Sequence, residues 1–290
     1  MSGRPVTVTH VQPGAIASHP DRVAIEEPLE IRLHGRPFVV AMRTPGADRE
    51  LAAGFLLSER VIRSADELGT IEYCTDRSTF DVRRSSFENH EPRTTNHERS
   101  LSNIVNVTLA GDAADRIDRV LAERRNVTTN SSCGLCGRQT LDSLAVDVPP
   151  IATTLTIPSS LVLDLPKKLR GSQTVFDETG GLHAAGLFAS DGALVDAAED
   201  VGRHNAVDKV VGRMLMSERL PLTEHVLCVS GRTSFEILQK ALFAGIPIVA
   251  AVSAPSSLAI ELAEAFGITL IGFVRGDSFN IYTHQHRVIR

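Results

Sequence analysis

Two cysteines separated by Gly-Leu stand in a glycine- and serine-rich segment, Cys133-Gly-Leu-Cys136-Gly137. A thiol pair of this kind can hold zinc, exchange electrons as a dithiol, carry a persulfide, or have no chemical role. Zinc needs four ligands and the remaining cysteines, Cys74 and Cys228, are isolated in the sequence, so no zinc is expected. A redox dithiol normally follows the first strand of a β-α-β unit, and no such unit is expected here.

A persulfide carrier is the interpretation that fits the segment best. It requires one nucleophilic sulfur on an exposed segment and a second thiol close enough to assist release of the sulfur. The glycines leave both sulfurs accessible, and Arg138 with the start of a short helix at residues 139–144 would stabilise the thiolate. Cys133 and Cys136 are therefore the candidate catalytic residues, whereas Cys74 and Cys228 are interpreted as buried apolar side chains.

Polar turns follow the predicted strands in the second half of the chain, at Glu199–Asn205, Ser230–Ser234, Ser253–Ser257 and Phe273–Ser278. The carboxyl ends of parallel strands meet at one edge of a sheet, where ligands bind and helix N-termini present free N–H groups. Arg203, Arg232 and Arg275 would add fork-shaped donors that suit phosphate. We therefore expect a phosphate-bearing small molecule at this edge, and the alternative is that these polar residues only cap helices.

The ionisable residues next to these turns have two interpretations each. His183 is favoured as a hydrogen-bonded structural histidine, whereas His204 is as compatible with a functional role as with a structural one. Asp208 and Lys209 either form an ion pair on their helix or reach the site from its first turns. The candidate ligand contacts at this edge, besides the last turn, are Arg203, His204, Ser230 and Arg232.

The composition is that of an ordinary globular protein, with 290 residues, 30 Lys and Arg against 35 Asp and Glu, and 42% hydrophobic residues. Four cysteines are too few for a disulfide-stapled secreted scaffold, so we expect a cytoplasmic protein with reduced thiols. The net charge of −5, the absence of Trp and the presence of only 2 Tyr argue against nucleic-acid binding. The longest apolar run, at residues 246–252, is too short to cross a membrane.

The elements that must position these residues fall into two predicted domains. Apolar alternation at 29–33 and 38–42 around His34-Gly35 predicts a hairpin, followed by a helix that Asp48 caps and whose apolar face extends to Ile62. The aliphatic-poor residues 75–100 predict a flexible surface loop, and a strand at 103–109 and a helix at 113–124 follow. This pattern predicts an N-terminal α+β domain over residues 1–130. The cysteine segment and Pro149-Pro150 then form a junction at 131–150.

The second predicted domain, residues 151–290, has an alternating α/β pattern. Asp191-Gly192 predicts a hairpin, and a helix with an apolar face over 207–215 follows it. Apolar runs at 226–229, 246–252 and 268–274 then alternate with helices, the first of which would begin with a capping box of Thr233 and Glu236 and stop at Gly245. Right-handed crossovers would make these strands parallel, in a sheet covered by helices on both faces.

Several sequence motifs follow one another along the chain: Cys133–Gly137, Phe176–Gly186, Glu199–Lys209, Ser230–Ser234 and Gly272–Tyr282. In this order they resemble the formate dehydrogenase accessory sulfurtransferase family, FdhD. Together these motifs are far more specific than a lone Cys-x-x-Cys. The resemblance runs from about residue 20 to the C-terminus and is weakest at 75–100, where nothing is carried over.

The resemblance implies a protein that accepts sulfur on Cys133 from an L-cysteine desulfurase. The sulfur would pass to molybdenum bis(molybdopterin guanine dinucleotide), as formate dehydrogenase activity requires. It also implies that the second domain has a cytidine deaminase-like fold with three α/β/α layers. The deaminase zinc motifs are absent from the corresponding turns, so deamination is not expected. By this resemblance the guanine dinucleotide would be contacted by Phe273, Val274, Arg275, Gly276, Asp277 and Ser278.

Two functions from different classes remain open. In the first, the protein is a sulfurtransferase, an enzyme whose Cys133 is a covalent carrier. In the second, it is a non-catalytic chaperone that binds the molybdenum cofactor and delivers it to formate dehydrogenase, and the thiols are ligands or redox protection. The expected partners are an L-cysteine desulfurase, formate dehydrogenase and the cofactor, with no nucleic acid and no membrane, and a homodimer is an open alternative to a monomer.

Overall fold

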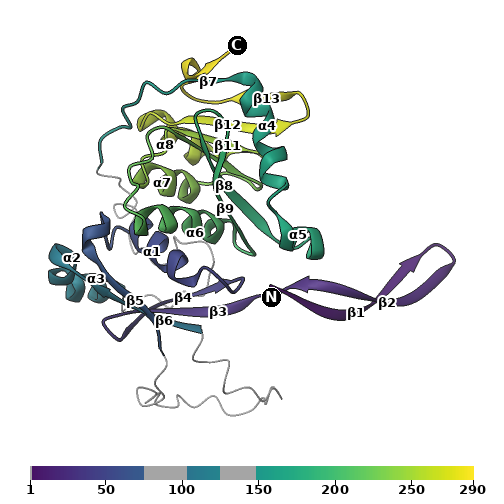
Figure 1. Cartoon of the computed structure of the whole chain (residues 1–290), viewed down its shortest axis with the longest axis horizontal. Helices are drawn as coiled ribbons and strands as arrows, with labels where there is room; N and C mark the ends of the chain where they lie inside the picture. The colour runs from purple at the N-terminus through teal and green to yellow at the C-terminus, as the bar shows by residue number, and fades with distance from the viewer. Residues whose placement is uncertain (1, 75–102, 125–147) are drawn as a thin grey trace.

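The computed structural model describes residues 2–74, 103–124 and 148–290 (Figure 1). The loop predicted at 75–100, the cysteine motif at 133–137 and the short helix predicted at 139–144 lie outside these residues. The described part combines helices and strands in several sheets, which confirms the predicted mixed α and β class. None of its helices is long and apolar enough to span a membrane.

A six-stranded sheet lies at the centre of residues 148–290, in the order β13-β12-β11-β10-β8-β9. Strands β10, β11 and β12 are parallel, as predicted, whereas β8, β9 and β13 are antiparallel to their neighbours. The hairpin of β8 and β9 turns at Asp191-Gly192, with a φ of 79° at Gly192, which confirms the predicted hairpin. The strands are β8 (His183–Ala189), β9 (Leu194–Asp200), β10 (His225–Val229), β11 (Ile248–Ala251), β12 (Thr269–Arg275) and β13 (Ser278–Ile281).

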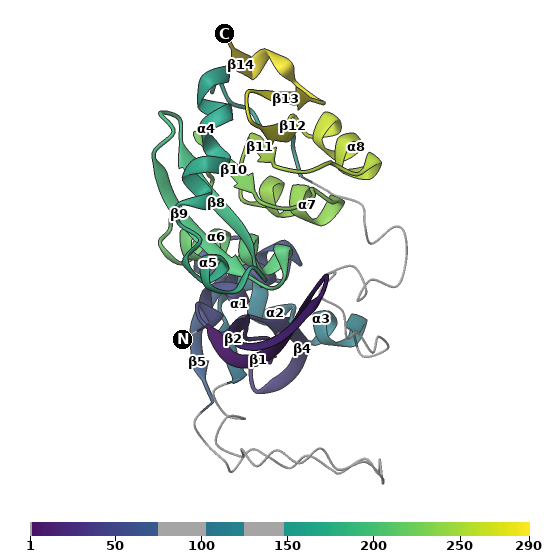
Figure 2. The same cartoon turned by 90° about the vertical axis from the view of Figure 1, so that its right-hand side faces the viewer.

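Helices cover both faces of this sheet, as predicted (Figure 2). One face carries α6 (Arg203–Met216), α7 (Phe235–Phe243) and α8 (Ser257–Ala265), and the other carries α4 (Ser159–Arg170). Helices α7 and α8 share a face because successive right-handed crossovers step in the same direction along the sheet. Side chains alternate across the strands, so Leu227 packs in the core on the α7 side and the next residue, Cys228, packs in the core on the α4 side.

The two described cysteines differ in environment. Cys228 is completely buried, and burial raises the pKa of its thiol to about 12, so it is an apolar core residue as predicted. Cys74 is only half-buried, so the prediction that it is buried is wrong. It follows an edge strand, where a side chain reaches the surface of the sheet rather than its core.

A second sheet, of four strands in the order β4-β3-β6-β5, lies in the N-terminal part of the chain. The hairpin predicted at His34-Gly35 is confirmed, since both residues have positive φ between paired strands. The helix predicted at 113–124 is instead two helices that break at Arg116, whose guanidinium binds Glu67 at 2.9 Å. The elements are β3 (Glu27–Leu33), β4 (Arg36–Arg43), α1 (Asp48–Ser58), β5 (Leu68–Tyr73), β6 (Ile104–Leu109), α2 (Gly111–Asp115) and α3 (Ile117–Arg124).

Two predicted helix starts are wrong in detail. Asp48 is the first residue of α1 rather than its cap, because its carboxylate pairs with the buried guanidinium of Arg43 at 2.9 Å. At α7 the cap position is Ser234, and its hydroxyl lies 3.1 Å from Nε2 of His204 instead of binding a helix N–H group. The capping box predicted from Thr233 therefore does not form, and the buried Thr233 hydroxyl has no hydrogen-bond partner in the described part of the chain.

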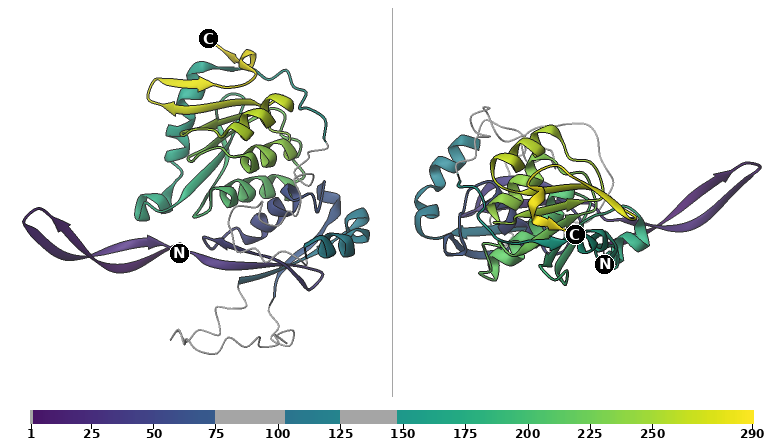
Figure 3. Two further views of the ribbon diagram at one scale, coloured as in Figure 1. Left: turned by 180° about the vertical axis from the view of Figure 1, so that it is seen from behind. Right: turned by 90° about the horizontal axis from the view of Figure 1, so that it is seen from above.

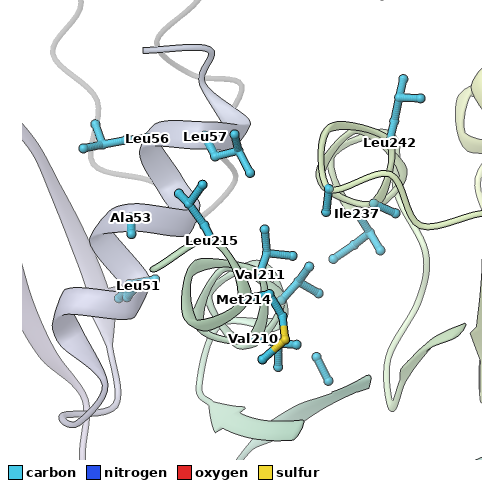
Figure 4. Packing of buried hydrophobic residues seen from close by; sticks show 14 of the residues in the cluster. Leu51, Ala53, Leu56, Leu57, Val210, Val211, Met214, Leu215, Ile237 and Leu242 are labelled. Carbon is cyan, nitrogen blue, oxygen red and sulfur yellow. The ribbon is translucent and has the colours of Figure 1, made fainter. Parts of the chain in front are cut away.

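Helices α1 and α6 cross in close contact and join the two sheets through one hydrophobic cluster (Figure 4). Gly54 of α1 and Gly212 of α6 form the crossing, since a Cβ on either glycine would overlap a carbonyl oxygen of the opposite helix. Ile31 in the N-terminal sheet and Leu227 in the central sheet belong to this same cluster. The position of α6, which begins at the candidate site, is thus tied to the N-terminal sheet.

Charged side chains are buried beside this crossing. Asp208 pairs with Lys240 at 2.7 Å and Lys209 pairs with Asp200 at 2.7 Å, so the predicted ion pair between Asp208 and Lys209 does not form. Neighbouring residues of a helix point about 100° apart, which directs these two side chains toward different elements. Burial raises the pKa of the Asp208 carboxyl to about 6, although the charge of Lys240 acts in the opposite direction.

Residues 3–24 form a two-stranded arm that extends away from the body (Figures 1 and 3). Strands β1 (Gly3–Gln12) and β2 (Ala15–Ala24) pair with each other, and residues 9–22 are exposed throughout. The base of the arm packs on α5 (Thr174–Thr179), where Arg22 pairs with Glu178 at 3.1 Å. The arm was not predicted, although residues 6–9 alternate apolar and polar side chains and Pro13-Gly14 is typical of a turn.

Candidate functional site

The strand ends at one edge of the central sheet bring the predicted turns together. Strands β10, β11 and β12 end at this edge, and β8, which is antiparallel to β10, begins there with His183. Ser230 follows β10 and makes two hydrogen bonds with Ala184. The N–H of Ser230 donates to the Ala184 carbonyl at 3.0 Å, and the N–H of Ala184 donates to the Ser230 Oγ at 2.9 Å. These bonds fix Ser230 beside His183 at the start of β8.

A pocket of about 560 Å³ opens at this edge, on the face of the sheet that α4 covers. Its size lies within the range of about 300–1,000 Å³ that is usual for small-molecule sites. Ser230 and His183 lie in its wall, and the other side comes from the end of α4, from α5 and from the two glycines that precede β8. The lining residues are Pro166, Leu169, Arg170, Gln173, Phe176, Gly180, Gly181, Leu182, His183, Ser230 and Val252.

His183 is an ionisable residue of the pocket wall, and two arginines lie near it. Burial lowers the pKa of its imidazole below the ordinary value, and the charges of Arg203 and Arg232 act in the same direction against the carboxylate of Asp200. Neither ring nitrogen has a hydrogen bond within residues 2–74, 103–124 and 148–290. A Cβ on Gly231 would lie 3.2 Å from Nδ1, so glycine lets the turn after β10 approach the ring. The ring is therefore neutral near pH 7 and has unused hydrogen-bonding capacity.

Arg203 and Arg232 supply positive charge next to this histidine. Arg203 is the first residue of α6, and its Nε–H is shielded from solvent without an acceptor among the described residues. Arg232 is exposed in the turn after β10 and has no ion pair in the described part of the chain. A buried donor without an acceptor costs free energy, so an anionic group that accepted from Arg203 would be stabilised. The pair is thus suited to hold a phosphate.

Arg275 approaches the same edge from β12. Its Nε donates to the carbonyl of Val252 at 2.8 Å, and Val252 lines the pocket. Its guanidinium also lies 5.7 Å from the ring centroid of Phe273. The bond to Val252 holds Arg275 next to a lining residue of the pocket, although Arg275 itself does not line it.

The predicted contacts from 273 to 278 do not all present side chains to solvent. Phe273 is 38% exposed and has a φ of 54°, while Arg275, Gly276, Asp277 and Ser278 form the exposed turn between β12 and β13. Val274 is only 1% exposed and packs in the core on the α4 side. Any contact that Val274 makes with a ligand must therefore come from its backbone.

His204 does not line the pocket. It is buried at the start of α6, with Nε2 3.1 Å from the Ser234 hydroxyl and 3.8 Å from a carboxylate oxygen of Glu236. These contacts tie the beginning of α6 to the beginning of α7. Like Arg203, Arg232 and Arg275, His204 is therefore not among the lining residues of this pocket, and its contact with a ligand stays a prediction.

The side of the pocket formed by α4 and α5 was not predicted from the residues. The Glu199 carboxylate accepts the N–H groups of Val175 and Phe176 at 2.9 and 2.8 Å, and these bonds hold α5 against β9 and set Phe176 in the pocket wall. Arg170 lies 4.7 Å from the ring of Phe176. A signal for this side exists in the motif 176–186, where Gly180-Gly181 stands two residues before His183, with Leu182 between them.

No cluster of three or more His, Cys, Asp or Glu that could hold a metal occurs among the residues that the structure describes. The two candidate catalytic cysteines, Cys133 and Cys136, lie outside those residues. The described site therefore consists of a pocket with His183 in its wall and three arginines near it, none of which is among the lining residues. Guanidinium groups in such a place have the charge and the donors that an anionic ligand requires.

The FdhD/NarQ family matches residues 24–289 of the chain. The chain belongs to the FdhD/NarQ family. This match covers both sheets and all the turns at the strand edge, and it confirms the resemblance drawn from the sequence motifs.

Members of this family from distant organisms are similar over nearly the whole chain. The sulfur carrier protein FdhD of Streptomyces coelicolor is 50% identical over 97% of this chain and 94% of its own length. The FdhD protein of the same description from Sulfolobus acidocaldarius is 42% identical over 99% of both chains. A crystal structure of a formate dehydrogenase accessory protein from Desulfotalea psychrophila covers 100% of both chains with a TM-score of 0.74 and 24% identity, which shows that the fold is shared.

Proposed function

We propose that this member of the FdhD/NarQ family is a cytoplasmic sulfurtransferase that serves formate dehydrogenase. It would take sulfur on Cys133 from an L-cysteine desulfurase and pass it to molybdenum bis(molybdopterin guanine dinucleotide). Relatives that are 42 to 50% identical over nearly their whole length are described as sulfur carrier proteins, which supports the sulfur-carrying part. The observation that carries the cofactor part is the positive charge beside the pocket: Arg203 and Arg232 act on His183 in its wall, and Arg275 binds the carbonyl of Val252, another lining residue.

The cofactor would enter as a substrate, and the described residues would bind and orient it. Its guanine dinucleotide carries phosphates, which match the three guanidinium groups in charge and in hydrogen-bonding geometry. The unpartnered Nε–H of Arg203 is the donor whose burial a phosphate oxygen would best compensate. Phe176 in the pocket wall and the exposed Phe273 in the predicted contact turn offer rings on which a base could stack.

The sulfur steps balance with the two cysteines of the motif. The Cys133 thiolate attacks the outer sulfur of the desulfurase persulfide, and the desulfurase cysteine leaves as a thiolate. Attack of the Cys136 thiolate on the inner sulfur of the Cys133 persulfide then releases hydrosulfide and leaves a Cys133–Cys136 disulfide. A cellular dithiol must reduce this disulfide before the next cycle.

A cytidine deaminase-like fold for residues 151–290 is part of the same proposal. It is supported by the order of the central sheet, in which a hairpin comes first and parallel strands joined by helices follow. Deamination is not proposed, because the turns at the strand edge carry arginine, serine and histidine where a zinc deaminase needs a cluster of cysteine and histidine ligands.

The experiment that tests the carrier is mass spectrometry after incubation with a cysteine desulfurase and cysteine. Cys133 should gain the mass of one sulfur atom and lose it to a reductant, because a persulfide is reducible. Cys228→Ala is the matched control and should gain the sulfur unchanged, since the buried thiol with a pKa of about 12 has no reactive thiolate. Cys136→Ala should still accept sulfur but release it more slowly.

The alternative function, a non-catalytic cofactor chaperone, makes the opposite prediction for Cys133→Ala. A carrier variant loses sulfur transfer and keeps cofactor binding, whereas a chaperone whose thiols are ligands loses cofactor binding. Extra sulfur on Cys136, Cys74 or Cys228 of the unmodified chain, or on none of its cysteines, would show that Cys133 is not the carrier.

A further inference from the structure

His183 has the surroundings of a histidine that changes charge when the pocket fills. It lies in the pocket wall, and the charges of Arg203 and Arg232 act on it from α6 and from the turn after β10. The carboxylate of Asp200 acts on it from the end of β9 with the opposite sign. Without a ligand, two positive charges against one negative charge, together with burial, favour the neutral ring.

The remaining charged groups near the pocket are committed to other partners. Arg170, which lines the pocket from α4, forms an ion pair with Asp177. Glu199, whose backbone pairs with the residue after His183, turns its carboxylate to the N–H groups at the start of α5. The balance at the ring is therefore set by Arg203, Arg232 and Asp200.

We propose that His183 binds the anionic ligand of this pocket directly and takes up a proton as the ligand binds. A phosphate held by Arg203 and Arg232 neutralises the two charges that oppose protonation, and its oxygen accepts a hydrogen bond from an imidazolium N–H. Both ring nitrogens lack a hydrogen bond within the described residues, so one of them is free to make this bond. This inference rests on the proposed function, since it concerns the same pocket and the same class of ligand.

The sign of the pH dependence follows from linkage. The pKa of His183 is below its ordinary value in the free protein and rises in the complex. Binding then tightens as the pH falls through the pKa of the complex, and it levels off below the pKa of the free protein. One unit of difference between the two pKa values tightens binding about tenfold.

The test compares GDP binding to the unmodified full chain and to His183→Gln between pH 8 and pH 6. Glutamine keeps a hydrogen-bonding side chain that does not titrate. For each protein the affinity for GDP at pH 6 is divided by that at pH 8. This ratio should be about tenfold larger for the unmodified chain than for His183→Gln. The protonation of GDP itself is common to both proteins and cancels in this comparison.

His225→Gln is the matched control. His225 also has a pKa lowered chiefly by burial, but it stands at the first residue of β10, at the opposite edge of the sheet. This variant should keep the pH dependence of the unmodified chain. If it loses that dependence while His183→Gln keeps it, the proton is not taken up by His183.

Calorimetry of the unmodified chain in two buffers of different ionisation enthalpy provides a second measurement that needs no variant. The terminal phosphate of GDP can only lose a proton on binding to arginines, so a net uptake of protons must come from the protein. Net uptake at pH 7 supports the proposal. If GDP binds without proton uptake, and its pH dependence is equal in His183→Gln and the unmodified chain, the role of His183 is overturned while the proposed cofactor site stands. No GDP binding at any pH overturns this inference and the proposed cofactor site together.

Discussion

The three arginines of the strand edge differ in how firmly the fold holds them. Arg203 has a shielded Nε–H without an acceptor, and Arg232 is exposed in its turn. Arg275 is exposed, and among its groups the Nε bonds to the Val252 carbonyl. Arg275 is therefore the residue whose removal should change ligand binding with little effect on the core.

Arg275→Ala should weaken the binding of GDP about tenfold, which corresponds to about 1.4 kcal/mol, without lowering the free energy of unfolding measurably. The reason is that an exposed guanidinium contributes charge and hydrogen bonds rather than buried area. Calorimetric titration measures the affinity, and urea denaturation checks the fold. Arg219→Ala is the matched control, since Arg219 is also exposed but lies outside the strand edge, and its GDP affinity should stay unchanged. An unchanged affinity in folded Arg275→Ala would remove Arg275 from the site.

At the scale of single elements, the sequence predicts the turns and strands that are determined by neighbouring residues. The hairpins at His34-Gly35 and Asp191-Gly192 and the parallel strands were predictable, because the turn residues tolerate positive φ and the strands are apolar runs. The helix caps were not, because contacts that the local pattern does not show decide them. The Asp48 carboxylate pairs with Arg43 instead of capping α1, and the cap residue of α7 is Ser234, whose hydroxyl contacts His204, rather than the predicted Thr233.

The candidate site shows the same division. The edge and its arginines follow from the alternation of strands and helices, which fixes where the turns must lie. The pocket wall from α4 and α5 depends on the bonds between Glu199 and the start of α5, which no spacing in the sequence encodes. His183, the first residue of β8, was favoured as a structural histidine but lies in the wall of this pocket.

Gly212→Ala should be among the most damaging small substitutions in this fold. Its Cβ would overlap the Glu50 carbonyl oxygen where α6 crosses α1, and backbone on both sides leaves no flexible atom to move away. We expect a loss of more than about 3 kcal/mol in the free energy of unfolding, as for severe overpacking. Denaturant titration measures this loss. Gly171→Ala, whose Cβ would lie 3.5 Å from its nearest neighbour, is the matched control and should change stability by less than about 1 kcal/mol. Similar stabilities for the two variants would mean that the helices do not cross as closely as described.

At the scale of the whole molecule, one hydrophobic cluster extends from the N-terminal sheet through α1 and α6 to the central sheet. The first residue of α6 is Arg203, so the N-terminal sheet positions one end of the ligand site. Buried ion pairs at this junction, such as Lys209 with Asp200, require a specific geometry and so also help to fix the position of α6. The domain boundaries at residues 130 and 150 stay a prediction, while the shared cluster shows that the two segments pack as one body.

The arm of β1 and β2 contributes no residue to this cluster or to the core on the α4 side of the central sheet. Its residues 9–22 are exposed, and contacts with α5 hold it only at its base. Replacing residues 10–17 by Asn-Gly would join Thr9 to Ser18, which are register partners, through a two-residue turn that suits a hairpin. The shortened chain should unfold with a free energy within about 1 kcal/mol of the unmodified chain, because residues that bury no surface contribute little to folding. It should also bind GDP with unchanged affinity, since none of the removed residues lines the pocket at the strand edge. Urea denaturation and calorimetry measure these quantities, and a marked loss of either one would show that the arm packs against the body instead of extending from it.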